Sequence, residues 1–372
     1  MSRAAGVSRK IVAKIGSSSI TDAQGVIAHS AIEKLCREVA ELRTLGHQCV
    51  IVTSGAIAAG LPELGLGGDK RPRDSVTLQA VSAVGQGSLI GAYKAELRRH
   101  DLVGGQVLLA PLDFMVRSQY LHARSTMQRL LELGVVPVVN ENDAIADDEI
   151  RFGDNDRLSA LVAHLIDADL MVLLTDTVGV LTADPRRDAT ASLIEEIVEF
   201  DHQLEAMAGG AGSARGSGGM ASKLAAAKIA AWSGVRSVIA SAQRDNVLLD
   251  ALNGVAGVGT TVIPKPHRLP ARKLWIAFAV GAAGQVTVDA GARRALAGGG
   301  HSLLAAGVVA IDGRFDAGDA VEVRTPDGAI FAKGLVRCSS VELTMMAGKR
   351  TAQLPEGAAP EVIHRDDLVM LP

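Results

Sequence analysis

A chain of 372 residues exceeds the usual size of one domain, about 100–200 residues, and indicates two or three domains that can each bury a core. Its 38 Lys plus Arg and 41 Asp plus Glu give a formal charge of −3, which excludes a global positive field for nucleic acid or an anionic membrane. Three widely spaced cysteines argue against a disulfide framework and a zinc site, and no run approaches the roughly 20 apolar residues of a membrane span. Since no apolar signal core follows Met1, we expect a cytoplasmic protein.

The first two thirds of the chain alternate short apolar runs with helical patterns, which is typical of a mainly parallel sheet covered by helices on both faces. Apolar residues at helical spacing between Ile32 and Leu45 predict a helix. Gly46 can end that helix in a left-handed cap, and residues 49–52 predict the strand that follows. Glycine and strand recur in this order at residues 134–139 and 234–240, so the sequence predicts an α/β/α sandwich.

The composition changes after a proline-rich stretch, P-K-P-H-R-L-P at residues 264–270, which favours an extended chain. Beyond it, short alternating apolar runs are separated by turn signals. Pro326-Asp327-Gly328, between residues 321–323 and 330–331, predicts a hairpin. We therefore expect an α/β domain over residues 1–265, a linker over 266–275 and a small β-rich barrel over 276–372.

The first predicted strand, residues 11–15, carries Lys14 inside an apolar run and ends in G-S-S-S. In open parallel sheets, ligands bind beyond the carboxyl ends of the strands. A buried, unpaired ammonium is costly, so one interpretation is a cation aimed at phosphates that the following turn cradles. The alternative is a lysine that reaches solvent from an edge strand.

Two more predicted strands end in polar residues. After residues 49–52, Ser54 can cap a helix N-terminus that attracts anions, or it can act as a structural cap alone. Residues 135–139 stop at N-E-N-D (140–143), whose carboxylate and carboxamide groups suit the ammonium and carboxylate of an amino acid. A solvated loop is the alternative for this second group.

Residues 152–159, F-G-D-N-D-R-L-S, open a helical pattern, and one Asp or Asn there is expected to be the N-cap. An aspartate at this place can also hold the ammonium groups of two phosphate-binding lysines. The predicted strand at residues 170–174 ends in Thr175 and Asp176, which either wrap a nucleotide or form a turn.

A glycine-rich segment, residues 209–223, runs into a predicted helix that begins near Lys223, as in phosphate-binding loops. A flexible linker is the alternative. The glycine-rich segment also contains a G-x-G-x-x-A motif, but a helical pattern rather than a strand precedes it, which argues against a dinucleotide site. No Walker A sequence occurs. The histidines and cysteines form no metal-binding cluster, so the polar groups best fit phosphoryl transfer with magnesium carried by the nucleotide.

The order of several short motifs is more specific than any one of them. They are K-I-G-S-S at 14–18, V-T-S-G-A-I-A-A-G at 52–60, A-V-G-Q at 83–86, N-E-N-D at 140–143, G-D-N-D at 153–156, L-L-T-D at 173–176 and G-G-M-A-S-K at 218–223. This set resembles the glutamate 5-kinases of the amino acid kinase family. The likeness covers nearly the whole chain, and the part after the linker resembles a PUA domain.

The resemblance implies that ATP phosphorylates the side-chain carboxylate of L-glutamate, with Mg²⁺, as the first step of proline synthesis. It implies that Lys14 and Lys223 offset charge on the phosphoryl group and that Asp156 orients them. A carboxylate with a pKa of about 4.3 is already nucleophilic at neutral pH, so no general base is expected. The implied glutamate-binding residues are Ser54, Asp143 and Asn155, and the implied ATP-binding residues are Lys14, Thr175, Asp176, Ser217, Gly218, Gly219, Met220, Ala221, Ser222 and Lys223.

The resemblance also implies a homodimer or homotetramer and feedback inhibition by proline. RNA binding is not expected, because residues 276–372 hold nine Lys or Arg against eleven Asp or Glu and no basic stripe. A regulatory or assembly role suits this domain better. The nearest alternatives are kinases that act on N-acetylglutamate or aspartate, and a non-catalytic RNA-binding protein is the alternative from another class.

Overall fold

The computed structural model describes residues 7–22, 26–145, 155–184, 188, 190–200, 204, 219–266, 268–354 and 359–371. The chain divides into two compact units, Met1–Arg268 and Leu269–Pro372. This division falls within residues 266–275, whose role as a linker stays a prediction; helix α11 (Ala271–Leu274) already begins there. Among the described residues, no helix is long and apolar enough to cross a membrane.

The first unit is built on an eight-stranded sheet with the order β3-β4-β2-β1-β5-β7-β8-β6. Every neighbouring pair is parallel except β7 and β8, which confirms the mainly parallel sheet. The strands are β1 (Lys10–Ile15), β2 (Gln48–Val52), β3 (Gly104–Leu109), β4 (Val136–Glu141), β5 (Leu170–Thr175), β6 (Glu196–Ile197), β7 (Arg236–Ser241) and β8 (Thr260–Val262).

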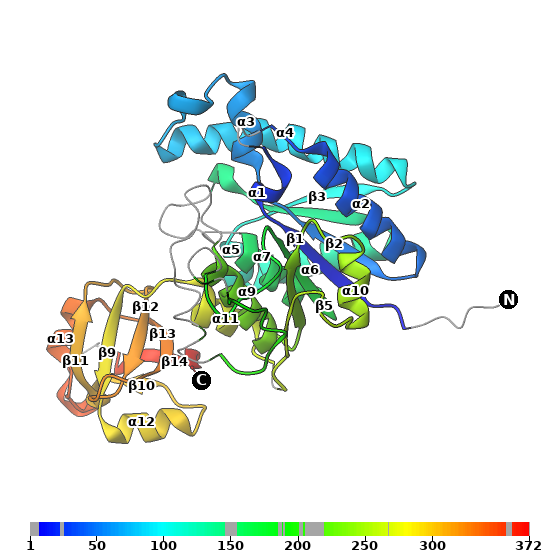
Figure 1. The fold of residues 1–372 in the computed structure, drawn as a ribbon. Coiled ribbons are helices and arrows are strands. Elements are labelled where there is room, and N and C mark those ends of the chain that lie inside the picture. Colours follow the sequence, from blue (N-terminus) through cyan, green and yellow to red (C-terminus); the bar gives the residue numbers. More distant parts are fainter. Residues whose placement is uncertain are drawn as a thin grey trace. The chain divides into compact units, whose positions relative to one another are not determined.

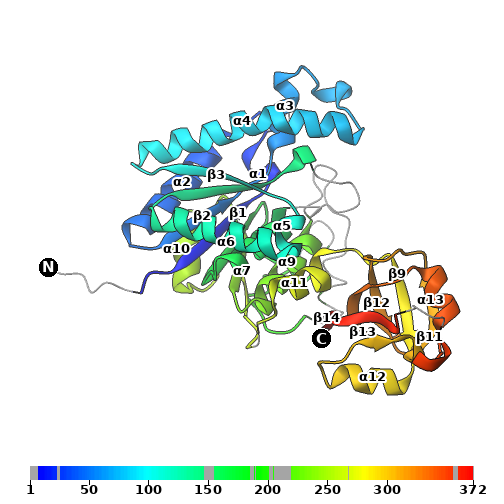
Figure 2. The ribbon, with the colours of Figure 1, turned by 180° about the vertical axis from the view of Figure 1, so that it is seen from behind.

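Helices cover both faces of this sheet (Figure 1 and Figure 2), as expected for an α/β/α sandwich. On one face lie α2, α4 and α10, and on the other lie α6, α7 and α9. The helices are α1 (Ser17–Ile20), α2 (His29–Thr44), α3 (Ala56–Glu63), α4 (Ser75–Arg99), α5 (Leu112–Met115), α6 (Arg117–Glu132), α7 (Asn155–Leu165), α9 (Met220–Trp232) and α10 (Val247–Asn253), with 3-10 turns η1 (Gly68–Lys70) and η2 (Asp143–Ile145).

Alternation along β1 decides which face of the sheet each of its side chains meets. Ile11, Ala13 and Ile15 belong to the apolar core shared with α2, α4 and α10. Because successive side chains of a strand point to opposite faces, Lys14 points to the face covered by α7 and α9. β1 is an interior strand, paired with both β2 and β5, so the interpretation of Lys14 as a solvent-reaching edge lysine is wrong.

Strand β4 extends further than the sequence predicts. Asn140 and Glu141 are its last residues and are buried, because they pair with Leu108 and Leu109 of β3. The expected polar group beyond the strand end is therefore smaller than N-E-N-D. Asn142 and the turn η2, which begins at Asp143, follow the strand.

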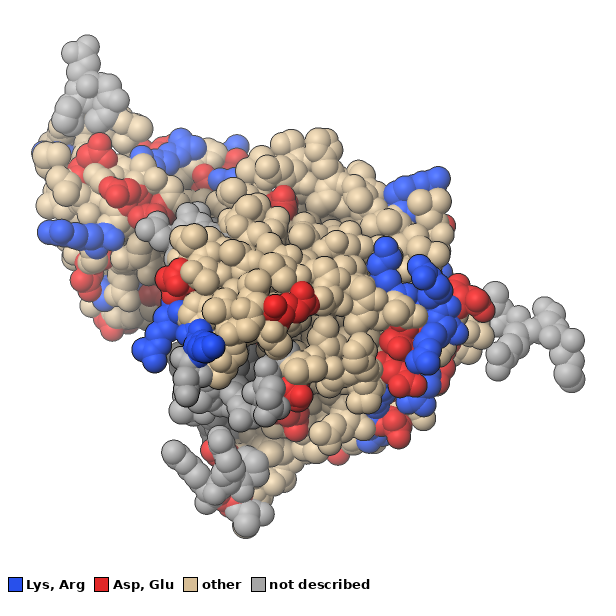
Figure 3. Space-filling model, turned by 90° about the horizontal axis from the view of Figure 1, so that it is seen from above, with Lys and Arg blue, Asp and Glu red and all other residues tan. Residues whose placement is uncertain are grey.

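Helix α4 carries a long uncharged stretch. The Asp74 carboxylate caps it by accepting a hydrogen bond from the Thr77 N–H at 2.8 Å, and no charged residue occurs from Ser75 to Tyr93. The helix packs closely on α3, since a Cβ atom at Gly85 would lie 2.0 Å from the carbonyl oxygen of Ala56. Figure 3, which looks onto the side where α3 and α4 lie, shows a broad face with few charged side chains.

The second unit contains a six-stranded sheet with the order β10-β14-β13-β12-β9-β11. β12 and β13 form the predicted hairpin, in which the Thr325 N–H donates to the Ala329 carbonyl at 3.0 Å and Gly328 has a φ of 91°. The curled sheet and its apolar core confirm the β-rich fold. Its elements after α11 are a π-helical turn η3 (Trp275–Ala279), β9 (Gly284–Val288), α12 (Ala290–Ala297), β10 (Leu303–Leu304), η4 (Ala305–Gly307), β11 (Val308–Gly313), β12 (Ala320–Arg324), β13 (Ile330–Val336), α13 (Ser340–Met346), η5 (Thr351–Gln353) and β14 (Glu361–Met370).

Candidate functional site

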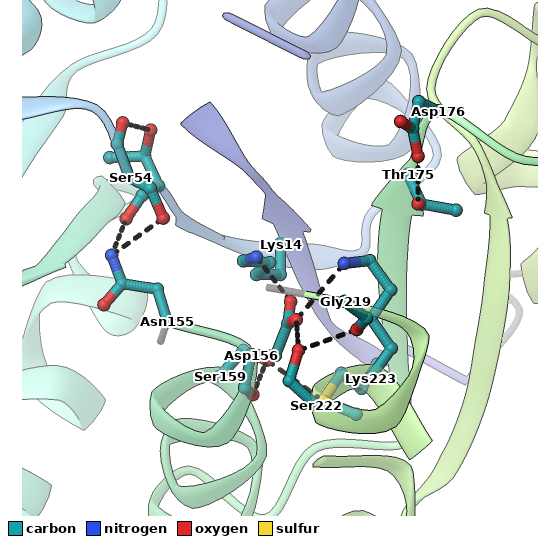
Figure 4. Close-up of polar contacts among 12 residues, drawn as sticks. Lys14, Ser54, Asn155, Asp156, Ser159, Thr175, Asp176, Gly219, Ser222 and Lys223 are labelled. Carbon is teal, nitrogen blue, oxygen red and sulfur yellow. Dashed lines mark hydrogen bonds and ion pairs between the residues drawn. The ribbon is translucent and has the colours of Figure 1, made fainter. Parts of the chain in front are cut away.

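A buried carboxylate lies between two lysines at the centre of the first unit's polar site (Figure 4). Asp156 is 0% exposed, and Lys14 and Lys223 are 3% and 7% exposed. Lys14 Nζ contacts Asp156 Oδ1, and Lys223 Nζ lies 3.3 Å from Asp156 Oδ2. Ser222 Oγ donates a hydrogen bond to the same Oδ2 at 2.8 Å. Residues from three distant parts of the sequence thus form one ionic cluster, called the Lys-Asp-Lys trio below.

Three elements position the trio. Lys14 lies in the last part of β1, Asp156 is the second residue of α7, and Lys223 lies in the first turn of α9. Helices α7 and α9 pack against each other on the face to which Lys14 points. Their N-terminal turns therefore meet its ammonium group.

The pKa of Asp156 determines the charge state of the trio. Burial alone would raise the pKa of Asp156, but the ammonium groups of Lys14 and Lys223, with hydrogen bonds from Lys14 and Ser222, hold that pKa below its usual range. The carboxylate is therefore ionised at neutral pH and contacts both ammonium groups. Two cations held this close together suit an anionic ligand.

A second polar group adjoins the trio through Asn155, the neighbour of Asp156. Asn155 Nδ2 lies within hydrogen-bond distance of three acceptors, which share its two hydrogens: the Thr53 carbonyl at 2.5 Å, Asn140 Oδ1 at 2.6 Å and Ser54 Oγ at 3.0 Å. Ser54 and Asn155, two of the residues expected to bind an amino acid, are therefore in direct contact (Figure 4). We call Thr53, Ser54, Asn140 and Asn155 the Asn155 group.

Asp143, the third residue expected at the amino-acid site, lines a cavity of about 350 Å³. Other lining residues are Ser82, Ala83, Gln86, Gly87, Gln106, Leu108, Glu141, Asn142 and Ala144. Gln86 accepts a hydrogen bond from Asn140 Nδ2 at 2.7 Å, which links this cavity to the Asn155 group. Sequence reasoning gave Gln86 no role of its own, although the A-V-G-Q motif contains it.

Apart from Lys14 on β1, the described residues expected to bind ATP lie at the end of β5 and the start of α9. Thr175 Oγ1 donates to Asp176 Oδ1 at 3.0 Å, and Figure 4 shows this pair on a different strand from Lys14. The Gly219 carbonyl accepts from Ser222 Oγ at 2.9 Å and from the Lys223 N–H at 3.3 Å. Met220 and Ala221 open α9, whereas positions 217 and 218 lie outside the described residues.

Comparison with known proteins matches both units. The family model of the amino acid kinase family matches residues 9–241, and that of the PUA domain matches residues 284–357. The chain is 45% identical to the glutamate 5-kinases of Burkholderia lata and Burkholderia ambifaria over 368 residues, which is 98% of each chain. Among solved structures, isopentenyl phosphate kinase has a TM-score of 0.50 at 21% identity and covers 68% of this chain and 99% of its own, a likeness of fold alone.

Proposed function

The chain belongs to the amino acid kinase family, and we propose that it transfers the γ-phosphoryl group of ATP to the side-chain carboxylate of L-glutamate, giving L-glutamyl 5-phosphate and ADP. The observation that carries this proposal is the Lys-Asp-Lys trio, which lies next to the Asn155 group and at the start of α9. Near full-length similarity to glutamate 5-kinases favours glutamate over N-acetylglutamate or aspartate as the acceptor, and so a role in the first step of proline synthesis.

Phosphoryl transfer requires positioning and charge neutralisation more than covalent help from the protein. The side-chain carboxylate of glutamate has a pKa of about 4.3 and is ionised at neutral pH. It can therefore attack the γ-phosphoryl group without a general base. Lys14 and Lys223 would neutralise charge on the transferring phosphoryl group. Asp156 would keep both ammonium groups in place through charge-assisted hydrogen bonds.

The glutamate site would be formed by Ser54, Asn155 and Asp143. The hydrogen bond between Ser54 and Asn155 fixes two of these side chains next to the trio. Asp143 lines the adjoining cavity, where its carboxylate suits a positively charged group of the amino acid.

The start of α9 would receive the phosphates of ATP, because the N-terminus of a helix presents free N–H groups and a positive dipole end to anions. Thr175, Asp176 and residues 217–223 complete the proposed nucleotide site. Mg²⁺ would be held by the phosphates of ATP and would neutralise their charge. Asp156 does not fit as its ligand, since Lys14, Lys223 and Ser222 already contact its two oxygens.

We also propose, from the same resemblance, inhibition by proline and assembly as a homodimer or homotetramer. The uncharged stretch of α4 offers a surface for such assembly, because large charge-poor patches are more typical of interfaces than of free surface. Light scattering after gel filtration tests the assembly, and a monomeric mass would contradict it. The acidic balance of residues 276–372 supports a regulatory or assembly role for the second unit rather than RNA binding.

The proposed reaction is tested by trapping the acyl phosphate with hydroxylamine in the presence of Mg-ATP and glutamate, N-acetylglutamate or aspartate. We expect hydroxamate from glutamate alone, reduced about 100- to 1,000-fold in Lys223→Ala. The matched control is Lys228→Ala on the same helix, where the ammonium lies 5.8 Å from the centre of the Phe200 ring. Turnover of another acceptor only would overturn glutamate as the substrate, and no turnover at all would overturn the proposed reaction.

A further inference from the structure

Three carboxamide side chains form a continuous hydrogen-bonded chain beside the proposed glutamate site. Asn155 Nδ2, at the start of α7, donates to Asn140 Oδ1 on β4 at 2.6 Å. Asn140 Nδ2 in turn donates to Gln86 Oε1 on α4 at 2.7 Å. Asn140 is 2% exposed and Asn155 7% exposed, whereas Gln86 is half-buried, so the chain runs from the interior toward the cavity that Gln86 lines.

The direction of this chain is fixed by a backbone group. The Thr53 carbonyl oxygen can only accept a hydrogen bond, so the side chain of Asn155 must turn its Nδ2 toward it, at 2.5 Å. Asn140 must then present its Oδ1 to Asn155 and its Nδ2 to Gln86. Gln86 must present its Oε1, because a donor at that position would face the Nδ2 of Asn140.

The fixed direction leaves the other end of the Asn155 amide for a ligand. Figure 4 shows the nitrogen of Asn155 turned toward Ser54 and its oxygen turned away. Asn155 Oδ1 is buried and has no hydrogen-bond partner in the part of the chain that the structure describes. Because buried polar atoms are normally hydrogen-bonded, this acceptor is suited to a donor that arrives with the substrate.

We infer that Gln86 and Asn140 are positioning residues that hold Asn155 Oδ1 ready to accept a hydrogen bond from the α-ammonium group of the acceptor amino acid. The inference rests on the proposed function, in which L-glutamate is the substrate that receives the phosphoryl group. Its α-ammonium group carries only hydrogen-bond donors and therefore matches the acceptor Asn155 Oδ1. Gln86 acts at a distance through Asn140, and its other face lines the cavity that also contains Asp143.

Rigid packing supports this role. Gln86 follows Gly85, where α4 touches α3 so closely that a Cβ atom would lie 2.3 Å from the backbone nitrogen of Gly60. Helix α3 begins just after Ser54 and Gly55. Gln86 at one end of the chain, and the segment with the Thr53 carbonyl that sets its direction, are therefore held by two helices in direct contact, α4 and α3.

Three substitutions at Gln86 separate hydrogen-bond direction from size and stability. Gln86→Glu keeps an acceptor, Gln86→Met removes hydrogen bonding, and Gln86→Lys offers donors only. We expect the KM for glutamate to stay near the wild-type value in Gln86→Glu and to rise several-fold in Gln86→Met. It should rise about 10- to 100-fold in Gln86→Lys, which sets an ammonium against Asn140 Nδ2 and so works against the direction that the Thr53 carbonyl imposes on Asn155. The KM for ATP should be unchanged in all three.

Two controls accompany this series. Ala83→Lys adds an ammonium at another lining position of the same cavity and leaves the hydrogen bond between Gln86 and Asn140 in place, so it measures the effect of added charge. Glutarate lacks the α-ammonium, so the preference for glutamate over glutarate should shrink in Gln86→Lys and persist in Gln86→Glu. Thermal melts show whether any variant has simply lost its fold.

The outcomes distinguish this inference from the proposed function. Suppose that the wild type phosphorylates glutamate. Equal KM values for glutamate in the three Gln86 variants, or KM changes that only follow the loss of Tm, would then overturn the positioning role. An equal effect of Ala83→Lys and Gln86→Lys would overturn it too. If the wild type does not phosphorylate glutamate, the proposed function fails, and the assignment of Asn155 Oδ1 to the glutamate ammonium fails with it.

Discussion

Lys14 and Lys223 bind opposite oxygens of the same buried carboxylate, Asp156. One lysine comes from a central strand of the sheet and the other from the first turn of a covering helix. Asp156 therefore joins β1 to α9 and also fixes the distance between two cations. Its contributions to stability and to catalysis can be measured separately.

Asp156→Asn keeps the shape of the side chain but removes its charge. Two buried ammonium groups then lose their counter-ion, so we expect the free energy of unfolding to fall by about 3–5 kcal/mol. The kcat should fall about 100- to 1,000-fold because neither ammonium is held in place. Chemical denaturation and steady-state kinetics measure the two effects.

The control for this change is Asp250→Asn, which breaks a partly exposed ion pair with Arg244 at 2.8 Å. It should cost less than about 1 kcal/mol and leave kcat unchanged. Wild-type kcat in Asp156→Asn would contradict the proposed positioning of the lysines.

Ser222→Ala removes a hydroxyl that lies 2.8 Å from Asp156 Oδ2 and 2.9 Å from the Gly219 carbonyl. Loss of a hydrogen bond to a charged group should lower kcat/KM for ATP by about 10- to 100-fold. Ser233→Ala, at the other end of α9, removes a hydroxyl that donates to the Ile229 carbonyl at 2.8 Å and should leave the ATP kinetics unchanged. Similar losses in both variants would show that the effect comes from the helix and not from the site.

His164, on α7, should make stability depend on pH. Burial, and then the positive charge of Arg268, lowers the pKa of His164 to about 4. An unfolded histidine, with a pKa of about 6.5, binds its proton first as pH falls, so the folded state loses up to about 3 kcal/mol between about pH 6.5 and 4. Urea denaturation across this range should show this loss in the wild type and not in His164→Gln.

The same substitution at His122, an exposed position of α6, serves as the comparison for His164. His122→Gln should retain the pH-dependent loss of stability. If all three proteins lose stability equally between about pH 6.5 and 4, His164 is not its source.

Gly85→Ala tests the contact between α3 and α4. The added Cβ would lie 2.0 Å from the Ala56 carbonyl oxygen, so we expect the free energy of unfolding to fall by about 1–3 kcal/mol. Because α3 follows Ser54 and α4 carries Gln86, the KM for glutamate should also rise. Gly91→Ala, in the same helix with nothing within 4 Å of the added Cβ, should instead stabilise the protein by up to about 1 kcal/mol. A neutral Gly85→Ala would contradict the tight contact.

The sequence by itself determined the order and type of the main elements. Alternating apolar runs and helical spacing predicted strands that match β1, β2, β4, β5 and β7, and the glycines at 46, 134 and 234 have the left-handed φ values expected of helix ends. A lysine within the apolar first strand was a local signal of the ionic site, as were the polar residues that open α7 and α9. These features depend on neighbours within a few residues, which is why a single sequence reveals them.

Only the tertiary structure decided which of these residues meet. The contacts of Asp156 with two lysines, and the chain from Asn155 through Asn140 to Gln86, join segments that no local pattern relates. The end of β4 was misplaced for the same reason, since Asn140 and Glu141 are polar in sequence but are held in the sheet by pairing with β3. Hydrogen-bond direction is the clearest case: the Thr53 carbonyl sets it, and that backbone group is the same for every amino acid, so only its position in the fold gives it this role.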